Sequence, residues 1–287
     1  MAFNWQTFKT RSLTAVVFVI VMLAGLLWNR WSFFILFSVV QFGAWAEYQQ
    51  LVGTFNPDYK RIISFHRYGI MVGGWCLLLF FTNSELSILG VSLTELGFWV
   101  GVLFMIFLPL IMFLESKAIF LKNIGYSIFG VLYISLPLAL LINLRNLWNE
   151  EAYQFSLTLP LLTIFSLWVN DTMAYIVGSI IGRSPLSSIS PKKTWEGTIG
   201  GIVLTIVVIS LLASITGRLA VIHAAILSGL VAVSGTFGDL FESKLKRMAG
   251  VKDSGSIMPG HGGFLDRFDS LFFAAPCVWL YSQFFIR

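Results

Sequence analysis

The sequence predicts an all-α, polytopic integral membrane protein, and three observations support this fold class. Hydrophobic residues make up 57% of the 287 positions and charged residues only 11%, whereas a soluble domain carries roughly 25% charged residues. Apolar stretches close to the ~20 residues that a helix needs to cross a bilayer recur along the chain. Basic residues are concentrated in alternate loops between these stretches. The two cysteines, Cys76 and Cys277, lie inside apolar stretches, so neither a disulfide framework nor a cysteine metal site is expected.

About nine apolar stretches account for the expected transmembrane helices. In order along the chain they are 13–29, 31–51, 68–82, 97–114, 124–144, 157–182, 198–216, 219–243 and 270–286. The third is short, and an extension into 83–90 is an alternative. The first follows Lys9 and Arg11 as a signal peptide would, but a second apolar stretch begins almost at once, which favours an uncleaved helix.

The distribution of basic residues predicts a cytoplasmic N-terminus. When nine helices are threaded from that side, all of the 19 basic residues except Arg30, Arg145, Arg218 and Arg287 face the cytoplasm. This asymmetry follows the positive-inside rule. The net charge of +5 therefore reflects topology, and no nucleic-acid partner is expected. A bacterial inner membrane is the expected location, because the chain has no long N-terminal extension, and the polar sites are expected on its cytoplasmic side.

Polar content divides the chain into two regions within one expected membrane-embedded unit. Residues 1–150 are mostly apolar with short loops, and their expected role is structural. Residues 151–287 contain the polar loops expected on the cytoplasmic side, and they form the expected catalytic region. No linker, repeat or low-complexity tract separates the two regions.

Asp171 lies in the middle of the predicted span 157–182 and needs an explanation. An ionised carboxylate there costs at least about 2.5–3.5 kcal/mol on insertion scales. Helical spacing places Asp171 on one face with Tyr175 and Gly178. Two interpretations are open: a buried carboxylate satisfied by Tyr175 or a neighbouring helix, and a carboxylate that lines a polar cavity.

The loop after this span combines hydroxyl and ammonium groups. Lys192, Lys193 and Thr194 follow a serine-rich stretch, and Glu196 precedes glycines at an expected helix start, where it is a candidate cap. Adjacent lysines beside a membrane fix topology or contact anionic lipid. Hydroxyl and ammonium groups also supply the donors that phosphate oxygens need, so a phosphate site is the second interpretation of this loop.

Charged residues of both signs gather in residues 239–269, between two apolar stretches. If the preceding span continues as a helix, Asp239, Glu242, Ser243 and Lys246 fall on one face. That pattern fits either a solvated stripe of salt bridges or a functional site. Poor solvation of Asp239 near the membrane end of the helix favours the site.

The same segment then becomes rich in glycine. Gly262 and Gly263 allow main-chain N–H groups to come close to a ligand. His261 fits either a phosphate donor or a structural hydrogen bond. Arg267 fits either a substrate contact or an ion pair with a neighbouring aspartate.

Several oxygen ligands and several cations therefore occur in this part of the chain. Asp239 and Asp266, with Asp269 and Asp171 as further candidates, offer the carboxylates that Mg²⁺ prefers. Lysine and arginine side chains bind phosphates directly. No Walker A, G-x-G-x-x-G or H-E-x-x-H pattern occurs. The residues alone predict metal-assisted phosphoryl or nucleotidyl transfer, without identifying a nucleotide or a lipid.

The residues from 243 to 269 form one long motif. It reads Ser-Lys-Leu-Lys-Arg from 243, four residues, Lys252-Asp253, and then Pro-Gly-His-Gly-Gly-Phe-Leu-Asp-Arg-Phe-Asp from 259. Upstream, Asn-Asp-Thr begins at 170 and Ser-Pro-Lys-Lys-Thr at 190. Together these motifs resemble the signature of the phosphatidate cytidylyltransferase (CDP-diacylglycerol synthase) family. The resemblance is sharp over 170–269, whereas over 1–150 it rests on the pattern of hydrophobic spans.

The resemblance implies the reaction CTP + phosphatidate → CDP-diacylglycerol + pyrophosphate. It also implies Mg²⁺, with K⁺ as a candidate second cation, and a homodimer in the bilayer. By motif position, Asp239 and Asp266 are the implied metal ligands, with Asp269 as a further candidate, and Ser243 and Lys246 complete the catalytic set. The expected substrate-binding residues are Lys192, Lys193, Thr194, Arg247, Lys252, His261, Gly262, Gly263 and Arg267, with Asp171 and Tyr175 on the floor of the cavity.

Other membrane functions fit the sequence less well. The nearest enzymatic alternative is a CTP-dependent lipid kinase, which would use related residues. A CDP-alcohol phosphatidyltransferase is disfavoured because its D-G-x-x-A-R…G-x-x-x-D-x-x-x-D arrangement does not occur. An ion-coupled transporter, with Asp171 and Asp239 as coupling sites, would predict polar residues in several spans of both halves, and the first half lacks them.

Overall fold

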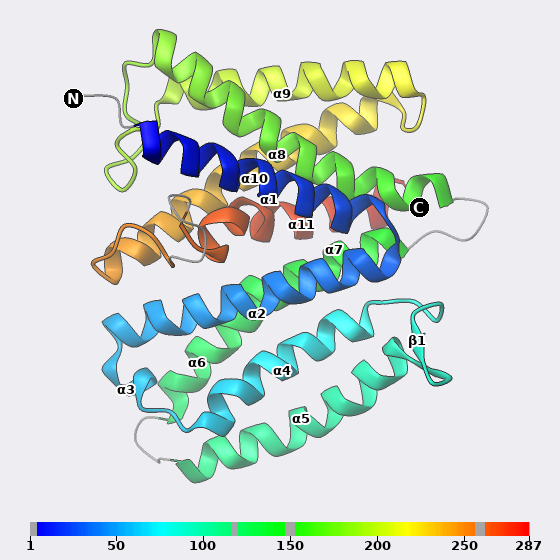
Figure 1. The fold of residues 1–287 in the computed structure, drawn as a ribbon, viewed down its shortest axis with the longest axis vertical. Coiled ribbons are helices and arrows are strands. Elements are labelled where there is room, and N and C mark those ends of the chain that lie inside the picture. Colours follow the sequence, from blue (N-terminus) through cyan, green and yellow to red (C-terminus); the bar gives the residue numbers. More distant parts are fainter. Residues whose placement is uncertain (1–4, 116–119, 147–152, 256–261, 287) are drawn as a thin grey trace. The chain divides into compact units, whose positions relative to one another are not determined.

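The computed structural model of the chain describes residues 5–115, 120–146, 153–255 and 262–286. Helices dominate this part of the chain, and one short hairpin interrupts them (Figure 1). The helices up to residue 130 are α1 (Trp5–Leu27), α2 (Arg30–Phe55), α3 (Pro57–Lys60), α4 (Ser64–Phe80), α5 (Leu93–Glu115) and α6 (Phe120–Gly130). They are followed by a π-helical turn, η1 (Val131–Ser135), and by α7 (Leu136–Asn146), α8 (Tyr153–Ile181), α9 (Trp195–Thr216), α10 (Val221–Met248) and α11 (Phe264–Phe285). The hairpin pairs β1 (Ser87–Ile88) with β2 (Val91–Ser92).

The helical class predicted from the sequence is confirmed for the described residues. Within them, five helical segments are long and apolar enough to cross a bilayer: Leu93–Ile111, Leu121–Asn146, Ser156–Ile181, Trp195–Thr216 and Val221–Met248. The count of nine spans and the cytoplasmic N-terminus remain predictions. The extension of the third span into 83–90 is wrong, because α4 ends at Phe80 and the hairpin occupies part of that range. Cys76 and Cys277 are both free thiols.

The chain forms two compact units. The first comprises Met1–Ile142 and Met248–Phe268, and the second comprises Asn143–Arg247 and Asp269–Arg287. The helix α11 is continuous, and its first residues belong to the first unit.

The helix α2 supplies much of the core of the first unit. Its residues Phe37, Trp45 and Tyr48 are almost completely buried. Trp45 Nε1 and Gln41 Nε2 donate hydrogen bonds to Ser135 Oγ in η1, at 2.9 and 2.8 Å. Such bonds hold helices together in a bilayer, where lipid is as apolar as the helix surfaces and gives them little drive to associate.

Close packing of α8 against α9 organises the second unit. A Cβ added to Gly197 would lie 2.7 Å from the carbonyl oxygen of Ala174, and a Cβ added to Gly201 would lie 2.8 Å from Ala174 Cβ. Small residues on both helices therefore let their backbones approach. This contact fixes the two ends of the loop at 182–194, which carries the predicted phosphate-binding lysines.

Candidate active site

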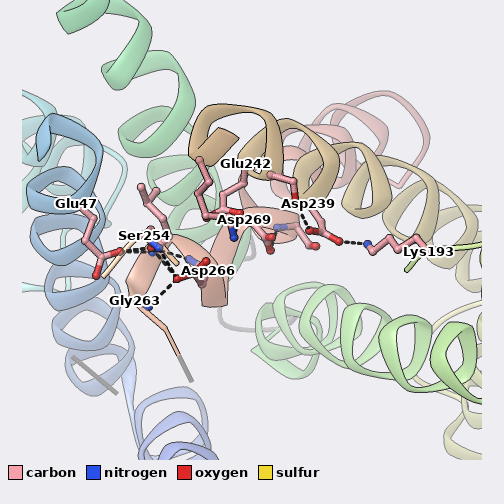
Figure 2. Close-up of polar contacts among 12 residues, drawn as sticks. Glu47, Lys193, Asp239, Glu242, Ser254, Gly263, Asp266 and Asp269 are labelled. Atoms are coloured by element: carbon pink, nitrogen blue, oxygen red, sulfur yellow. Dashed lines mark hydrogen bonds and ion pairs between the residues drawn. The ribbon is translucent and has the colours of Figure 1, made fainter. Parts of the chain in front are cut away.

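Three carboxylates gather in the second unit, where α10 passes α11. Asp239 and Glu242 come from α10 and Asp269 comes from α11, and one oxygen from each lies within 4.8 Å of the others (Figure 2). Glu242 is completely buried, whereas Asp239 and Asp269 are partly exposed. We call these three residues the acidic group. Carboxylate oxygens at this spacing suit a shared hard cation.

A close crossing of the two helices brings the acidic group together. A Cβ at Gly238 would lie 2.5 Å from the carbonyl oxygen of Asp269 and 3.0 Å from Ser270 Cα. Both of these are backbone atoms, which move only with the helix, so a side chain at position 238 would separate α10 from α11. Helical spacing then places Asp239 and Glu242 on the same side of α10. The position of the acidic group thus depends on a residue without a side chain.

Two lysines neutralise part of the acidic group. Lys193 forms an ion pair with Asp239, and Lys246 Nζ lies 2.5 Å from Glu242 Oε2, one turn further along α10 (Figure 2 shows the first pair). Ser243 Oγ lies 3.4 Å from Asp239 Oδ1, which makes this a weak contact. The polar face that the sequence predicts on α10 therefore exists. Its Glu242–Lys246 pair is largely buried rather than solvated.

A folded loop holds Lys193 near Asp239. Thr194 caps α9, because its hydroxyl accepts the N–H of Gly197 at 3.1 Å. Glu196 accepts the backbone N–H groups at 183–184 instead, at 3.1 and 3.2 Å. The interpretation of Glu196 as the cap of the helix is therefore wrong. Its carboxylate closes the base of the loop, because these two N–H groups follow the end of α8 and Glu196 lies in the first turn of α9.

Burial and nearby carboxylates act in opposite directions on Lys193. Loss of hydration lowers the pKa of its ammonium group below the usual value, and the negative charges of Asp171 and Asp269 oppose that shift. Asp171 and Tyr175 lie on an exposed face of α8. Asp171 thus contributes charge to the region around the acidic group.

A second carboxylate lies at the start of α11, within the first unit. Glu47 of α2 is only 5% exposed. Its Oε1 accepts the N–H of Phe264 and its Oε2 accepts the N–H of Leu265, both at 2.9 Å. The Ser254 hydroxyl lies 2.7 Å from the same Oε2 (Figure 2). A carboxylate from another helix therefore satisfies backbone donors that the first turn of α11 leaves without intrahelical partners.

Asp266 takes part in the same arrangement. Its Oδ2 accepts the N–H groups of Gly263 and Ser254, both at 2.8 Å, and lies 2.9 Å from the Ser254 hydroxyl. A Cβ at Gly262 would overlap this carboxylate, and Gly262 has a positive φ of 78°, so only glycine fits there. The predicted metal ligand Asp266 thus also holds the start of its own helix, as the acidic residue of a capping box does. We call Glu47, Ser254 and Asp266 the helix-start cluster.

The structure brings together part of the predicted site. Ser243, Lys246, Lys193 and Asp269 lie around Asp239 within the second unit. Asp266 belongs to the first unit, so its convergence with Asp239 on one cation remains a prediction. Besides Asp171 and Tyr175, the exposed members of the predicted set are Lys192, Arg247, Lys252 and Arg267, and His261 lies outside the described residues.

The sequence interpretation missed Glu47, because it assigned residues 1–150 a structural role. One signal was available: Glu47 is the sole acidic residue among the first 57 positions, and it lies inside a predicted span. A lone carboxylate in an apolar helix calls for a partner or a function. The identity of its partners, more than 200 residues away in the chain, required the structure.

Comparison with known proteins identifies the family. Residues 9–285 match the model of the Cytidylyltransferase family. The chain belongs to this family. The resemblance stated from the sequence motifs is therefore confirmed.

Individual relatives agree with this assignment. The cytidylyltransferase is 33% identical over 215 residues to the phosphatidate cytidylyltransferase of Bacillus subtilis, covering 73% of this chain and 76% of that one. It is 40% identical over 156 residues to the phosphatidate cytidylyltransferase of Synechocystis, covering 50% and 52%. It is 42% identical over 138 residues to the chloroplastic phosphatidate cytidylyltransferase 4 of Arabidopsis thaliana, covering 48% of this chain and 35% of the plant protein. The chain thus matches about half or less of the length of the last two relatives.

Proposed function

We propose that this cytidylyltransferase transfers the cytidylyl group of CTP to phosphatidate and releases pyrophosphate. The similarity to the Bacillus subtilis phosphatidate cytidylyltransferase over 73% of the chain carries the proposal. Apolar helices long enough to cross a bilayer support it, because phosphatidate is a membrane lipid. A CTP-dependent lipid kinase is the alternative to be excluded by experiment.

The reaction requires positioning of the two reactants and neutralisation of their charges more than it requires proton transfer. A phosphate oxygen of phosphatidate forms a bond to the α-phosphorus of CTP, while the bond from that phosphorus to the bridging oxygen of the β-phosphate breaks. The electron pair of that bond leaves with pyrophosphate. Both reactants are anions, so fixed positive groups and a suitable orientation lower the barrier.

The acidic group fits a divalent cation. Its donor set consists of carboxylate oxygens, which Mg²⁺ prefers, and the set is partly exposed, so that a nucleotide can share the cation. We propose that Asp239, Glu242 and Asp269 hold Mg²⁺, with Asp266 as the further predicted ligand and K⁺ as a candidate second cation. When bound, the metal would neutralise charge on the triphosphate and on leaving pyrophosphate.

Basic side chains around the acidic group would receive the phosphates. Lys193 and Lys246 lie beside the carboxylates, and Lys192, Arg247 and Lys252 are exposed. Lysine and arginine offset the repulsion between an anionic lipid and an anionic nucleotide. We propose further that the enzyme works as a homodimer with this site on the cytoplasmic side of a bacterial inner membrane.

In the test, the purified full-length protein is incubated with Mg²⁺ and with CTP that is labelled in the α-phosphate or in the cytosine. The lipid acceptor is either phosphatidate or diacylglycerol, in mixed micelles. We expect label in a CDP-lipid and release of pyrophosphate, with phosphatidate alone as acceptor. Formation of CDP together with a phosphorylated lipid from diacylglycerol would select the lipid kinase. The absence of any CTP-dependent product would leave the transporter as the alternative.

Removal of divalent cations is expected to abolish turnover. EDTA should stop CDP-lipid formation, and excess Mg²⁺ should restore it, because the acidic group would otherwise repel the triphosphate. Binding of Mn²⁺, followed by electron paramagnetic resonance, provides a readout independent of activity. Unchanged turnover in EDTA, after extensive dialysis against the chelator, would contradict the metal-assisted mechanism.

Lys246→Gln is expected to weaken the use of CTP. Loss of one charge-assisted phosphate contact should raise KM for CTP about 10-fold, since such contacts are worth about 1.5–3 kcal/mol. The matched control is Lys244→Gln, two residues earlier on α10 and exposed. An unchanged KM for CTP in a folded Lys246→Gln protein would remove Lys246 from nucleotide binding.

A further inference from the structure

We propose that Glu47 is a positioning residue for the reaction: through the start of α11 it sets the place of Asp266, without touching the substrate itself. The inference rests on the proposed function only for its effect on turnover. Its structural part, the hold of Glu47 on the start of α11, stands on the contacts of the first unit. Glu47 lies in α2, inside the region that the sequence interpretation treated as structural.

Both oxygens of Glu47 are used to hold the backbone of α11. Oε1 accepts the N–H of Phe264 and Oε2 accepts the N–H of Leu265, each at 2.9 Å. These are first-turn donors, which an α-helix leaves without intrahelical partners. Helix starts also favour negative charge. The two bonds together fix both the position and the rotation of the first turn of α11 relative to α2.

The Ser254 hydroxyl connects Glu47 to Asp266. Its oxygen lies 2.7 Å from Glu47 Oε2 and 2.9 Å from Asp266 Oδ2. A hydroxyl carries one proton and donates to one carboxylate at a time. The Ser254 N–H donates to Asp266 Oδ2 at 2.8 Å as well. Two connections therefore couple the position of Asp266 to Glu47. One runs through Ser254, and the other runs through the backbone of α11.

Three glycines lie so close to Glu47 or to the start of α11 that a side chain at any of these positions would overlap its neighbours. A Cβ at Gly255 or at Gly263 would overlap the Glu47 carboxylate. One turn earlier on α2, a Cβ at Gly43 would overlap the Phe264 ring. The backbone at the start of α11 and the Phe264 ring therefore pack tightly against the face of α2 that carries Gly43 and Glu47.

A purely stabilising role explains this arrangement less well. Burying a carboxylate is costly, and well-packed apolar residues often replace buried polar groups without loss of stability. An apolar residue at position 47 would not accept hydrogen bonds from two backbone N–H groups, nor contact the Ser254 hydroxyl. Because these contacts end on Asp266, a residue of the predicted catalytic set, Glu47 is expected to affect turnover more than stability.

The test compares Glu47→Gln with Gln49→Ala in the full-length protein. A glutamine at position 47 would keep the shape of the side chain, but its amide nitrogen would face one of the two backbone N–H donors. Gln49 lies on the same helix in the same unit, is buried, and donates to the Arg67 carbonyl at 2.9 Å rather than to α11. It also contacts the Tyr59 hydroxyl, so Gln49→Ala removes buried polar contacts of α2 that do not involve α11.

Two readouts are measured on both proteins. For Glu47→Gln we expect amide hydrogen exchange at Phe264 and Leu265 to accelerate about 10-fold or more, as loss of a hydrogen bond implies. We expect kcat to fall about 10–100-fold, as for groups that orient a ligand residue, with KM for CTP nearly unchanged. Gln49→Ala should leave both readouts at the wild-type values, and Glu47→Asp should recover part of the lost kcat.

The outcomes separate this inference from the proposed function. Unchanged exchange at α11, or wild-type kcat in Glu47→Gln, would overturn the positioning role. If wild-type protein forms no CDP-lipid, the proposed function fails while the exchange measurement still decides whether Glu47 holds the start of α11. If Glu47→Gln does not fold, Ser254→Ala removes only the connecting hydroxyl, and an unaltered kcat in that variant would equally overturn the inference.

Discussion

Asp239→Asn is expected to lower CDP-lipid formation by about 10³-fold or more, with the protein still folded in the membrane. Asparagine has the same shape but lacks the charge, so the acidic group loses part of its hold on a cation and Lys193 loses its ion-pair partner. Loss of preorganised charge stabilisation in an active site commonly costs about 10²–10³-fold, and loss of a metal ligand removes the contribution of the ion as well. The measurement is kcat/KM with labelled CTP over a range of Mg²⁺ concentrations.

Two comparisons sharpen this prediction. Glu95→Gln is the control, because Glu95 is an exposed acid at the start of α5 and accepts a local N–H, from Ser92 at 3.2 Å. Asp266→Asn is expected to lose turnover as well. A raised Mg²⁺ requirement in that variant would indicate a ligand, whereas an unchanged requirement with faster amide exchange would indicate a role in the helix-start cluster. Full activity of folded Asp239→Asn would remove the acidic group from the mechanism.

Gly238→Ala is expected to damage both stability and turnover through one methyl group. The new Cβ would lie 2.5 Å from the Asp269 carbonyl oxygen, so α10 and α11 must move apart. Overpacking of this kind costs about 1–3 kcal/mol, and the gain in helix propensity of about 1 kcal/mol offsets only part of it. A displacement of about 1 Å at the acidic group can reduce turnover about 10²-fold.

The matched control for this steric effect is Gly229→Ala on the same helix. Its Cβ would lie 3.3 Å from Ile206 Cδ1, the flexible end of a side chain, so the neighbour can yield. We expect Gly229→Ala to be neutral or stabilising by up to about 1 kcal/mol, with normal turnover. The measurements are thermal unfolding in detergent and kcat for both variants. Equal behaviour of the two would show that the close crossing at Gly238 does not position the acidic group.

Local periodicity made part of the site predictable. The face with Asp239, Glu242, Ser243 and Lys246 follows from helical spacing alone, and α10 does continue to Met248 as that face requires. Glu242 was placed on this face without being recognised as a candidate ligand. Its proximity to Asp269 depends on the crossing of two helices, and a pattern within one helix carries no information about that crossing.

Hydropathy and motif spacing by themselves determined the helical membrane class, the segments that form the helices, and the family. They could do so because the approximate length of a spanning helix and the spacing of its faces are local properties of the chain. Tertiary structure alone decided that Lys193 pairs with Asp239, that Gly238 joins Asp269 to the acidic group, and that Glu47 holds the start of α11. These contacts join segments tens to hundreds of residues apart, and they depend on which small residues let backbones approach, which only the packed chain reveals.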